Sequence, residues 1–82
     1  MAEYSVVFAR SARRELEQLE KGIARRILLR IEALGENPRP EASRTDDFWR
    51  IRVGDYRVIY SVDDRERTVD VGAIRHRGDA YR

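Results

Sequence analysis

The chain has 82 residues, no cysteine and one histidine, which excludes disulfides and a structural zinc site and leaves room for one small core. Its 17 basic and 15 acidic residues nearly balance, so any nucleic-acid site must come from segregation of the charges in space. All the bases except Lys21 are arginine, which suits bidentate phosphate recognition better than lysine does. No apolar run approaches the ~20 residues of a membrane span, and the N-terminus lacks a signal-peptide pattern. We therefore expect a single cytoplasmic domain over residues 1–82, with no membrane partner, no metal and no cofactor.

The first part of the chain predicts one strand followed by two helices. Side chains of residues 3–8 alternate with the period of a half-buried strand. From Arg10 apolar residues recur at helical spacing, and a second helical stripe follows Gly22 and ends at Gly35 and Pro38. Two adjacent amphipathic helices with a tight joint predict an αα-hairpin. The members of the two stripes are Ala12, Leu16, Leu19, Ile23, Ile27, Ile31 and Leu34.

The rest of the chain predicts one loop, three strands and a tail. The segment 36–47 holds both prolines and no periodicity, so we expect a loop. Gly54-Asp55 is a two-residue hairpin signal, and a four-residue turn suits residues 63–66. The three alternating runs that these turns separate are residues 48–53, 56–62 and 68–74, followed by a tail at 75–82.

The resulting order is β-α-α-β-β-β, an α+β fold. Short connections make consecutive elements run in opposite directions. We therefore expect a four-stranded antiparallel sheet in the order 1-4-3-2, with the α-hairpin packed on one face. The opposite face stays open, and we expect function there.

Arginines gather on this open face in the expected register. A loop at Gly54-Asp55 sets Arg52 directly opposite Arg57, and Arg50 lies two residues along the same strand. The apolar residues then turn toward the helices, as a core requires. They are Trp49, Ile51, Val53, Tyr56, Val58, Tyr60, Val69, Val71 and Ala73.

We expect such a cluster to bind an anion. Like charges in a cross-strand pair are unfavourable by up to ~1 kcal/mol. A turn at 63–66 would place Gly72 beside Arg57, leaving a hollow, and Asp70 on the diagonal, where it could neutralise one arginine but not three. The alternative is an arginine that is only solvated, which we expect for Arg65 and Arg67 at the acidic turn.

The tail carries groups that could do chemistry. A segment that leaves the last strand beside its neighbour can fold back over the arginines. A tail tyrosine could act there as a catalyst or pack as a lid, and both alternatives stay open. The groups concerned are Arg75, His76, Arg77, Asp79, Tyr81 and Arg82.

Two segments together resemble a known family. The run from Phe48 to Tyr60 (FWRIRVGDYRVIY) and the ending from Ile74 to Arg82 (IRHRGDAYR) resemble the RelE/ParE toxin superfamily of bacterial and archaeal toxin–antitoxin modules, most of all its RelE branch. The similarity extends over essentially the whole chain, including Glu36-Asn37-Pro38 after the second helix. Either segment alone would be a weak signal.

The resemblance implies a type II toxin: a metal-independent endoribonuclease that cleaves mRNA in the ribosomal A site and so inhibits translation. It implies a cognate antitoxin as partner, with DNA contacted only through that antitoxin. The residues that it implies by position are Arg50, Arg52 and Arg57 on the sheet and Arg75 and Tyr81 in the tail. We expect Arg52, Arg57, Arg75 and Tyr81 to be catalytic, and Arg50, with the neighbouring His76 and Arg77, to bind RNA.

The general base is the least determined role. The family often has lysines where this chain has Arg50 and Arg52, and arginine stays protonated and cannot act as a base. The resemblance favours Tyr81, whose pKa nearby cations would lower. His76 is the alternative.

Two other functions remain open. ParE-type relatives share the fold but inhibit DNA gyrase without nuclease chemistry. A degenerate, non-toxic relative that only binds an antitoxin is a third alternative. Basic sheet residues combined with a tail tyrosine favour the RelE reading.

Overall fold

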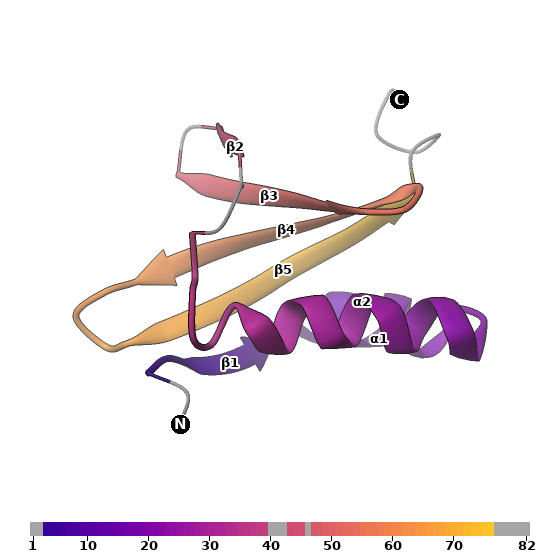
Figure 1. The fold of residues 1–82 in the computed structure, drawn as a ribbon, viewed down its shortest axis with the longest axis horizontal. Coiled ribbons are helices and arrows are strands. Elements are labelled where there is room, and N and C mark those ends of the chain that lie inside the picture. The colour runs from indigo at the N-terminus through magenta and orange to yellow at the C-terminus, as the bar shows by residue number, and fades with distance from the viewer. Residues whose placement is uncertain (1–2, 40–42, 46, 77–82) are drawn as a thin grey trace.

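A computed structural model describes residues 3–39, 43–45 and 47–76 of the chain (Figure 1). The strands in this part form one sheet in the order β1-β5-β4-β3-β2. Apart from the short β2, this confirms the predicted β-α-α-β-β-β succession and the strand order 1-4-3-2. The elements are β1 Ser5–Phe8, α1 Arg10–Glu17, α2 Lys21–Ala33, β2 Ser43–Thr45, β3 Phe48–Val53, β4 Tyr56–Asp63 and β5 Thr68–His76.

The direction of the first strand corrects our expectation. β1 runs parallel to β5, with Phe8 opposite Val71, whereas strict alternation of directions predicts an antiparallel pair. The reason is that α1 continues along β5 instead of turning back: farther along β5, the Ile74 N–H donates to a Glu15 carboxylate oxygen of α1 (3.2 Å). Of the two helices only α2 runs against β1, so the chain reverses once less often than expected before β5, and β1 and β5 point the same way (Figure 1).

The two helices form the predicted hairpin, but their joint lies at residues 18–20 rather than at Gly22. Gly22 belongs to the first turn of α2, where its N–H donates to the Glu20 side chain (3.1 Å). That bond satisfies one of the amide donors that a helix start leaves without an intrahelical acceptor. Neither helix in the described ranges is long and apolar enough to cross a membrane.

A short strand lies inside the segment predicted to be a loop. β2 pairs with β3 in antiparallel fashion, Ser43 opposite Arg50 and Thr45 opposite Phe48. Three residues are too few to show a period, so the sequence gives no sign of this strand. β2 lies along the edge of β3 that the predicted four-stranded sheet would leave unpaired.

The inner face of β3 and β4 is buried as predicted. Ile51, Val53 and Val58 belong to the core, together with buried residues of both helices. Among the described residues Tyr60 is the largest fully buried side chain, and its hydroxyl donates to the carbonyl oxygen of Pro38 (2.7 Å). Burial raises the pKa of Tyr60 to about 12, so this phenol stays a neutral donor.

The pairing of β4 with β5 differs from the predicted register. The turn spans residues 64–67 rather than 63–66, which places Val62 opposite Val69 rather than opposite Arg67. Arg67 closes this turn with a left-handed backbone (φ 52°), uncommon for a residue other than glycine. Nothing in the alternation of side chains marks which residues make the turn.

A bulge at Gly72 shifts the register further. Val71 pairs with Tyr60 and Ala73 pairs with Ile59, so Gly72 is the extra residue on β5. The expected hollow beside Arg57 is therefore absent, because Gly72 lies near Ile59 instead.

Beyond the bulge, the two faces of β5 exchange. Ile74, rather than the predicted Ala73, is buried at 4% exposure. The strand also continues to His76, two residues past its predicted end at Ile74. Arg75, expected in the tail, is therefore a strand residue.

Candidate nucleic-acid interface

Three arginines from three adjacent strands form one row across the sheet. Arg52 of β3 lies opposite Arg57 of β4, which in turn lies opposite Arg75 of β5. Neighbouring strands are about 4.8 Å apart, so the three side chains start within about 10 Å of one another. We call Arg52, Arg57 and Arg75 the arginine row. The predicted pairing of Arg52 with Arg57 is confirmed. The bulge on β5 brings Arg75 opposite Arg57 and so adds a third arginine.

The row brings like charges together at the end of the sheet near the β3–β4 turn. Arg52 and Arg75 are exposed and Arg57 is half-buried. The acid expected on the diagonal is not there: Asp70 lies opposite Ser61, four residues along β4 from Arg57, or about 13 Å. The like charges are thus not compensated in the way that the predicted register suggested.

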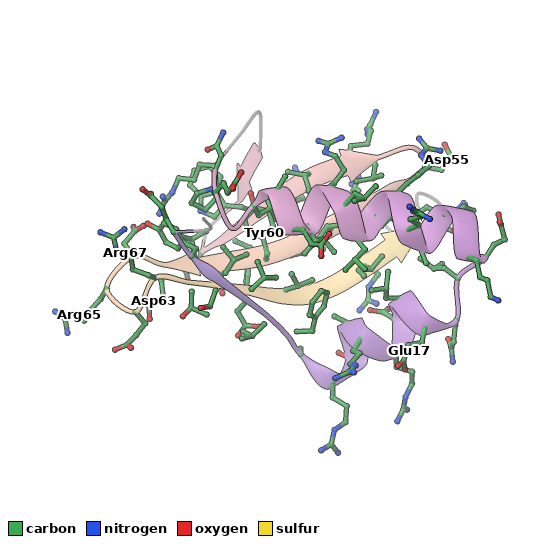
Figure 2. All side chains as sticks on the ribbon, turned by 60° about the horizontal axis from the view of Figure 1, so that its bottom comes forward. Glu17, Asp55, Tyr60, Asp63, Arg65 and Arg67 are labelled. Atoms are coloured by element: carbon green, nitrogen blue, oxygen red, sulfur yellow. The ribbon has the colours of Figure 1, made fainter. Side chains whose placement is uncertain are left out.

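A depression lies at the near end of the row. Its lining consists of Arg52, Gly54, Asp55, Tyr56 and Arg57. Asp55 sits on the β3–β4 turn, at the end of the sheet opposite Asp63 and Arg65 (Figure 2). The depression is therefore basic along the strands and acidic at the turn.

Arg50 extends the basic surface along β3. It lies two residues from Arg52 and so leaves the strand on the same face. Arg50 is half-buried and pairs with Ile59 on one side and Ser43 on the other. The structure thus brings all three predicted sheet arginines to one face.

Arg75 has a partner on α1. Its Nη1 forms an ion pair with Glu15 Oε2, while Glu15 Oε1 accepts the hydrogen bond from the Ile74 N–H. Sequence reasoning missed Glu15, which looks like any other acid of α1. Its contact depends on how α1 runs beside β5, which the sequence does not indicate.

His76 leaves β5 on the face opposite to the arginine row, because side chains alternate along a strand. It lies opposite Tyr56, and the two rings meet edge to face with centroids 5.1 Å apart. A cavity lined by Glu15, Gln18, Leu19, Tyr56, Ile74 and His76 opens on this side. The structure therefore groups His76 with Tyr56 and α1 rather than with the row. Arg77 and Tyr81, the other two predicted site residues, lie outside the described residues.

The opposite end of the sheet carries a second group of charges, at the β4–β5 turn. The Tyr4 hydroxyl donates to Asp64 Oδ1 and Arg39 Nη2 donates to Asp64 Oδ2, both at 2.6 Å. Both contacts lower the pKa of the Asp64 carboxyl, and the hydrogen bond from Tyr4 has the larger effect. The hydrogen bond between Tyr4 and Asp64 also raises the pKa of Tyr4. Arg39 also lies over the Trp49 ring, 5.5 Å from its centroid. We call Tyr4, Arg39 and Asp64 the Asp64 cluster.

Known proteins resemble this chain along nearly its whole length. Residues 6–81 match the family described as ParE toxin of type II toxin-antitoxin system, parDE. Toxin RelG of Mycobacterium tuberculosis is 34% identical over an alignment of 84 positions, which covers 96% of this chain and 97% of that protein.

Solved structures resemble the fold as well. The archaeal RelE–RelB complex from Pyrococcus horikoshii contains a chain with a TM-score of 0.82 and 30% identity, covering 93% of this chain and 97% of that one. The intact E. coli RelBE toxin–antitoxin complex contains one with a TM-score of 0.77 and 25% identity, covering 87% and 93% respectively. Both relatives were crystallised as toxin–antitoxin complexes.

Proposed function

Because the chain belongs to the RelE/ParE toxin family of type II toxin–antitoxin systems, we propose that it inhibits translation as a metal-independent, ribosome-dependent mRNA endonuclease. The observation that carries this proposal is the arginine row, in which arginines of three adjacent strands lie opposite one another on the same face of the sheet. Arginine forks match the oxygens of a phosphate, and a phosphate would relieve the repulsion between them. The names of the relatives support the RelE branch.

The proposed reaction needs only charge stabilisation and proton transfer. The ribose 2′-oxygen loses its proton and attacks the adjacent phosphorus, the bond from phosphorus to the 5′-oxygen breaks, and the departing 5′-oxygen takes a proton from solvent water. A 2′,3′-cyclic phosphate and a 5′-hydroxyl result. Arg52, Arg57 and Arg75 stabilise the additional negative charge on the phosphate oxygens in the transition state. Fixed donors of this kind contribute about 10²–10³ in rate each. Arg50, on the same face, positions the RNA strand.

A base must take the proton of the 2′-hydroxyl, and we assign this role to Tyr81. Arginine cannot accept a proton, so the row itself does not supply the base. His76 is the alternative, but it leaves β5 on the face away from the row, which supports Tyr81 instead. His76 and Arg77 then bind RNA outside the reacting centre, His76 from the opposite face of β5.

The proposed partner is a cognate antitoxin. The relatives from Pyrococcus horikoshii and E. coli were crystallised with theirs. A segment with acidic side chains and apolar anchors would suit the row and the exposed apolar residues of this chain, such as Val7 and Phe48.

A second candidate function follows from the matched family description, which names ParE. Toxins of that branch inhibit DNA gyrase by binding it. Primer extension on translated mRNA after induction of the chain separates the two functions, combined with a gyrase supercoiling assay. Breaks inside codons with normal supercoiling support the endonuclease. Intact mRNA with inhibited supercoiling refutes it in favour of the gyrase inhibitor.

A further inference from the structure

Glu15 links α1 to two consecutive residues of β5. One carboxylate oxygen accepts the Ile74 N–H, and the other forms the ion pair with Arg75. β1 pairs with β5 only as far as Val71, so this carboxylate occupies the edge of β5 where the neighbouring strand has ended. The contact thus lies at the outer end of the arginine row.

This contact differs from an ordinary surface ion pair. The Glu15 side chain is only 28% exposed, and a backbone bond fixes its carboxylate. Glu17, two residues along the same helix, is 68% exposed and meets Arg13 at 3.8 Å. Exposed pairs of that kind contribute little, because solvent screens them and long side chains lose freedom in forming them.

We propose that Glu15 is a positioning residue for Arg75, and that it holds the guanidinium at the outer end of the arginine row in the orientation that receives the RNA phosphate. Glu15 lies at the edge of β5 away from Arg57, so attraction to Glu15 and repulsion from Arg57, directly opposite on β4, both hold the Arg75 guanidinium at the outer end of the row. The ion pair engages Nη1, and a guanidinium carries five N–H donors, so the same group can hold Glu15 and a phosphate together. The inference rests on the proposed endonuclease function.

The test uses Glu15→Gln, with Glu17→Gln as the matched control. A glutamine at position 15 still offers a carbonyl oxygen to the Ile74 N–H, but it lacks the charge that holds Arg75. We expect Glu15→Gln to lower the single-turnover cleavage rate at saturating toxin about 10-fold, as small misplacements of a catalytic group do. The toxin concentration that gives half the maximal rate should stay unchanged, and Glu17→Gln should behave as the wild type.

A double variant separates positioning from folding. In an Arg75→Ala background the Glu15→Gln change should cause no further loss, since the group that it positions is gone. A loss that multiplies in that background would assign Glu15 a purely structural role. Wild-type cleavage by Glu15→Gln alone would also overturn the proposal.

A second measurement does not depend on cleavage. Arginine-selective ¹⁵N NMR, with Arg75 assigned through Arg75→Lys, should show restricted rotation of the Arg75 guanidinium in the wild type and in Glu17→Gln. That restriction should be lost in Glu15→Gln, and its persistence there would refute the positioning role. If the wild-type protein cleaves no mRNA, the proposed function fails, while the NMR result still decides whether Glu15 holds Arg75.

Discussion

The two ends of the sheet differ in how their charged residues are arranged: opposite charges pair at one end, and like charges are neighbours at the other. At the β4–β5 turn, Asp64 receives a phenol on one carboxylate oxygen and a guanidinium on the other. At the β3–β4 turn, Arg52, Arg57 and Arg75 stand side by side, with Glu15 at one end of the row and Asp55 near the other. Figure 2 shows the two ends, marked by Asp55 at one and by Asp63, Arg65 and Arg67 at the other.

We interpret this difference as a structural role for the β4–β5 end of the sheet and a ligand-binding role for the β3–β4 end. The Asp64 cluster connects residues from before β1, from the segment after α2 and from the β4–β5 turn, so its contacts link three parts of the fold, with a contribution to stability that solvent keeps small. The arginine row places like charges opposite each other, and a cross-strand pair of like charges is unfavourable by itself. Such costs are typical of sites whose stabilising partner is a ligand. Changes at the two ends should therefore separate activity from stability.

The largest effect is expected from the row itself. Arg52→Ala combined with Arg57→Ala removes two donors to the transition state, each worth about 10²–10³, and should lower the cleavage rate by about 10⁴-fold or more. The melting temperature should not fall, because like charges are removed. Cleavage on programmed ribosomes and thermal unfolding measure the two effects. Arg65→Ala, at the other end, is the control and should leave cleavage unchanged, whereas a folded double variant with full activity would remove the row from the mechanism.

A smaller loss is expected for the base. Tyr81→Phe should lower single-turnover cleavage by about 10²–10⁴, the range for loss of general acid–base catalysis. His76→Ala should cost much less, since this side chain lies on the other face of β5. The rate of each variant on programmed ribosomes checks the ranking. The reverse ranking would transfer the base role to His76.

We expect the antitoxin to cover the end of the sheet with the arginine row and to leave the end with the Asp64 cluster unchanged. Co-expression with the neighbouring small gene should give a stable heterocomplex whose cleavage of translated mRNA is reduced or absent. In this complex the row should be shielded, and the Asp64 cluster should keep its internal contacts. Hydrogen exchange and cleavage assays on the purified pair measure both. A pair that binds but cuts as fast as the free toxin contradicts neutralisation at the row.

The smallest effect on activity is expected at the Asp64 cluster. Asp64→Asn should lower the free energy of unfolding but leave the cleavage rate of the folded protein unchanged. The pKa of Asp64 lies below its ordinary value of 3.8 in the folded protein, so its contribution is complete above that value. The contribution is lost as the pH falls through the folded-state pKa. Urea unfolding at pH 7 should therefore separate wild type and variant, and the separation should shrink in acid; an equal separation at both pH values would assign it to another cause.

Local patterns predicted most of the fold. Alternation and helical spacing gave the order of elements and the buried residues Ile51, Val53 and Val58. The two-residue turn gave the β3–β4 register, and with it the pair Arg52 and Arg57. These features depend on neighbours in the sequence, which is why periodicity reveals them.

The features that were predicted wrongly depend on contacts between segments far apart in the sequence. The direction of β1, the register after residues 64–67 and the bulge at Gly72 all depend on contacts between distant segments. They decide that Arg75 joins the row and that Glu15 reaches it, so the site was predicted less completely than the fold. The family resemblance pointed to Arg75 by position, but only the register explains how this residue comes to stand beside Arg57.

A single RNA titration can compare RNA binding at the two ends of the sheet. Arginine side-chain NMR signals can be followed while a short RNA, made uncleavable by a 2′-deoxy sugar at the scissile position, is added to the wild-type protein. We expect the signals of Arg52, Arg57 and Arg75 to shift together and saturate, while those of Arg39, Arg65 and Arg67 stay in place. Shifts confined to the β4–β5 turn end, or spread equally over both ends, would contradict the claim that the arginine row is where this protein holds RNA.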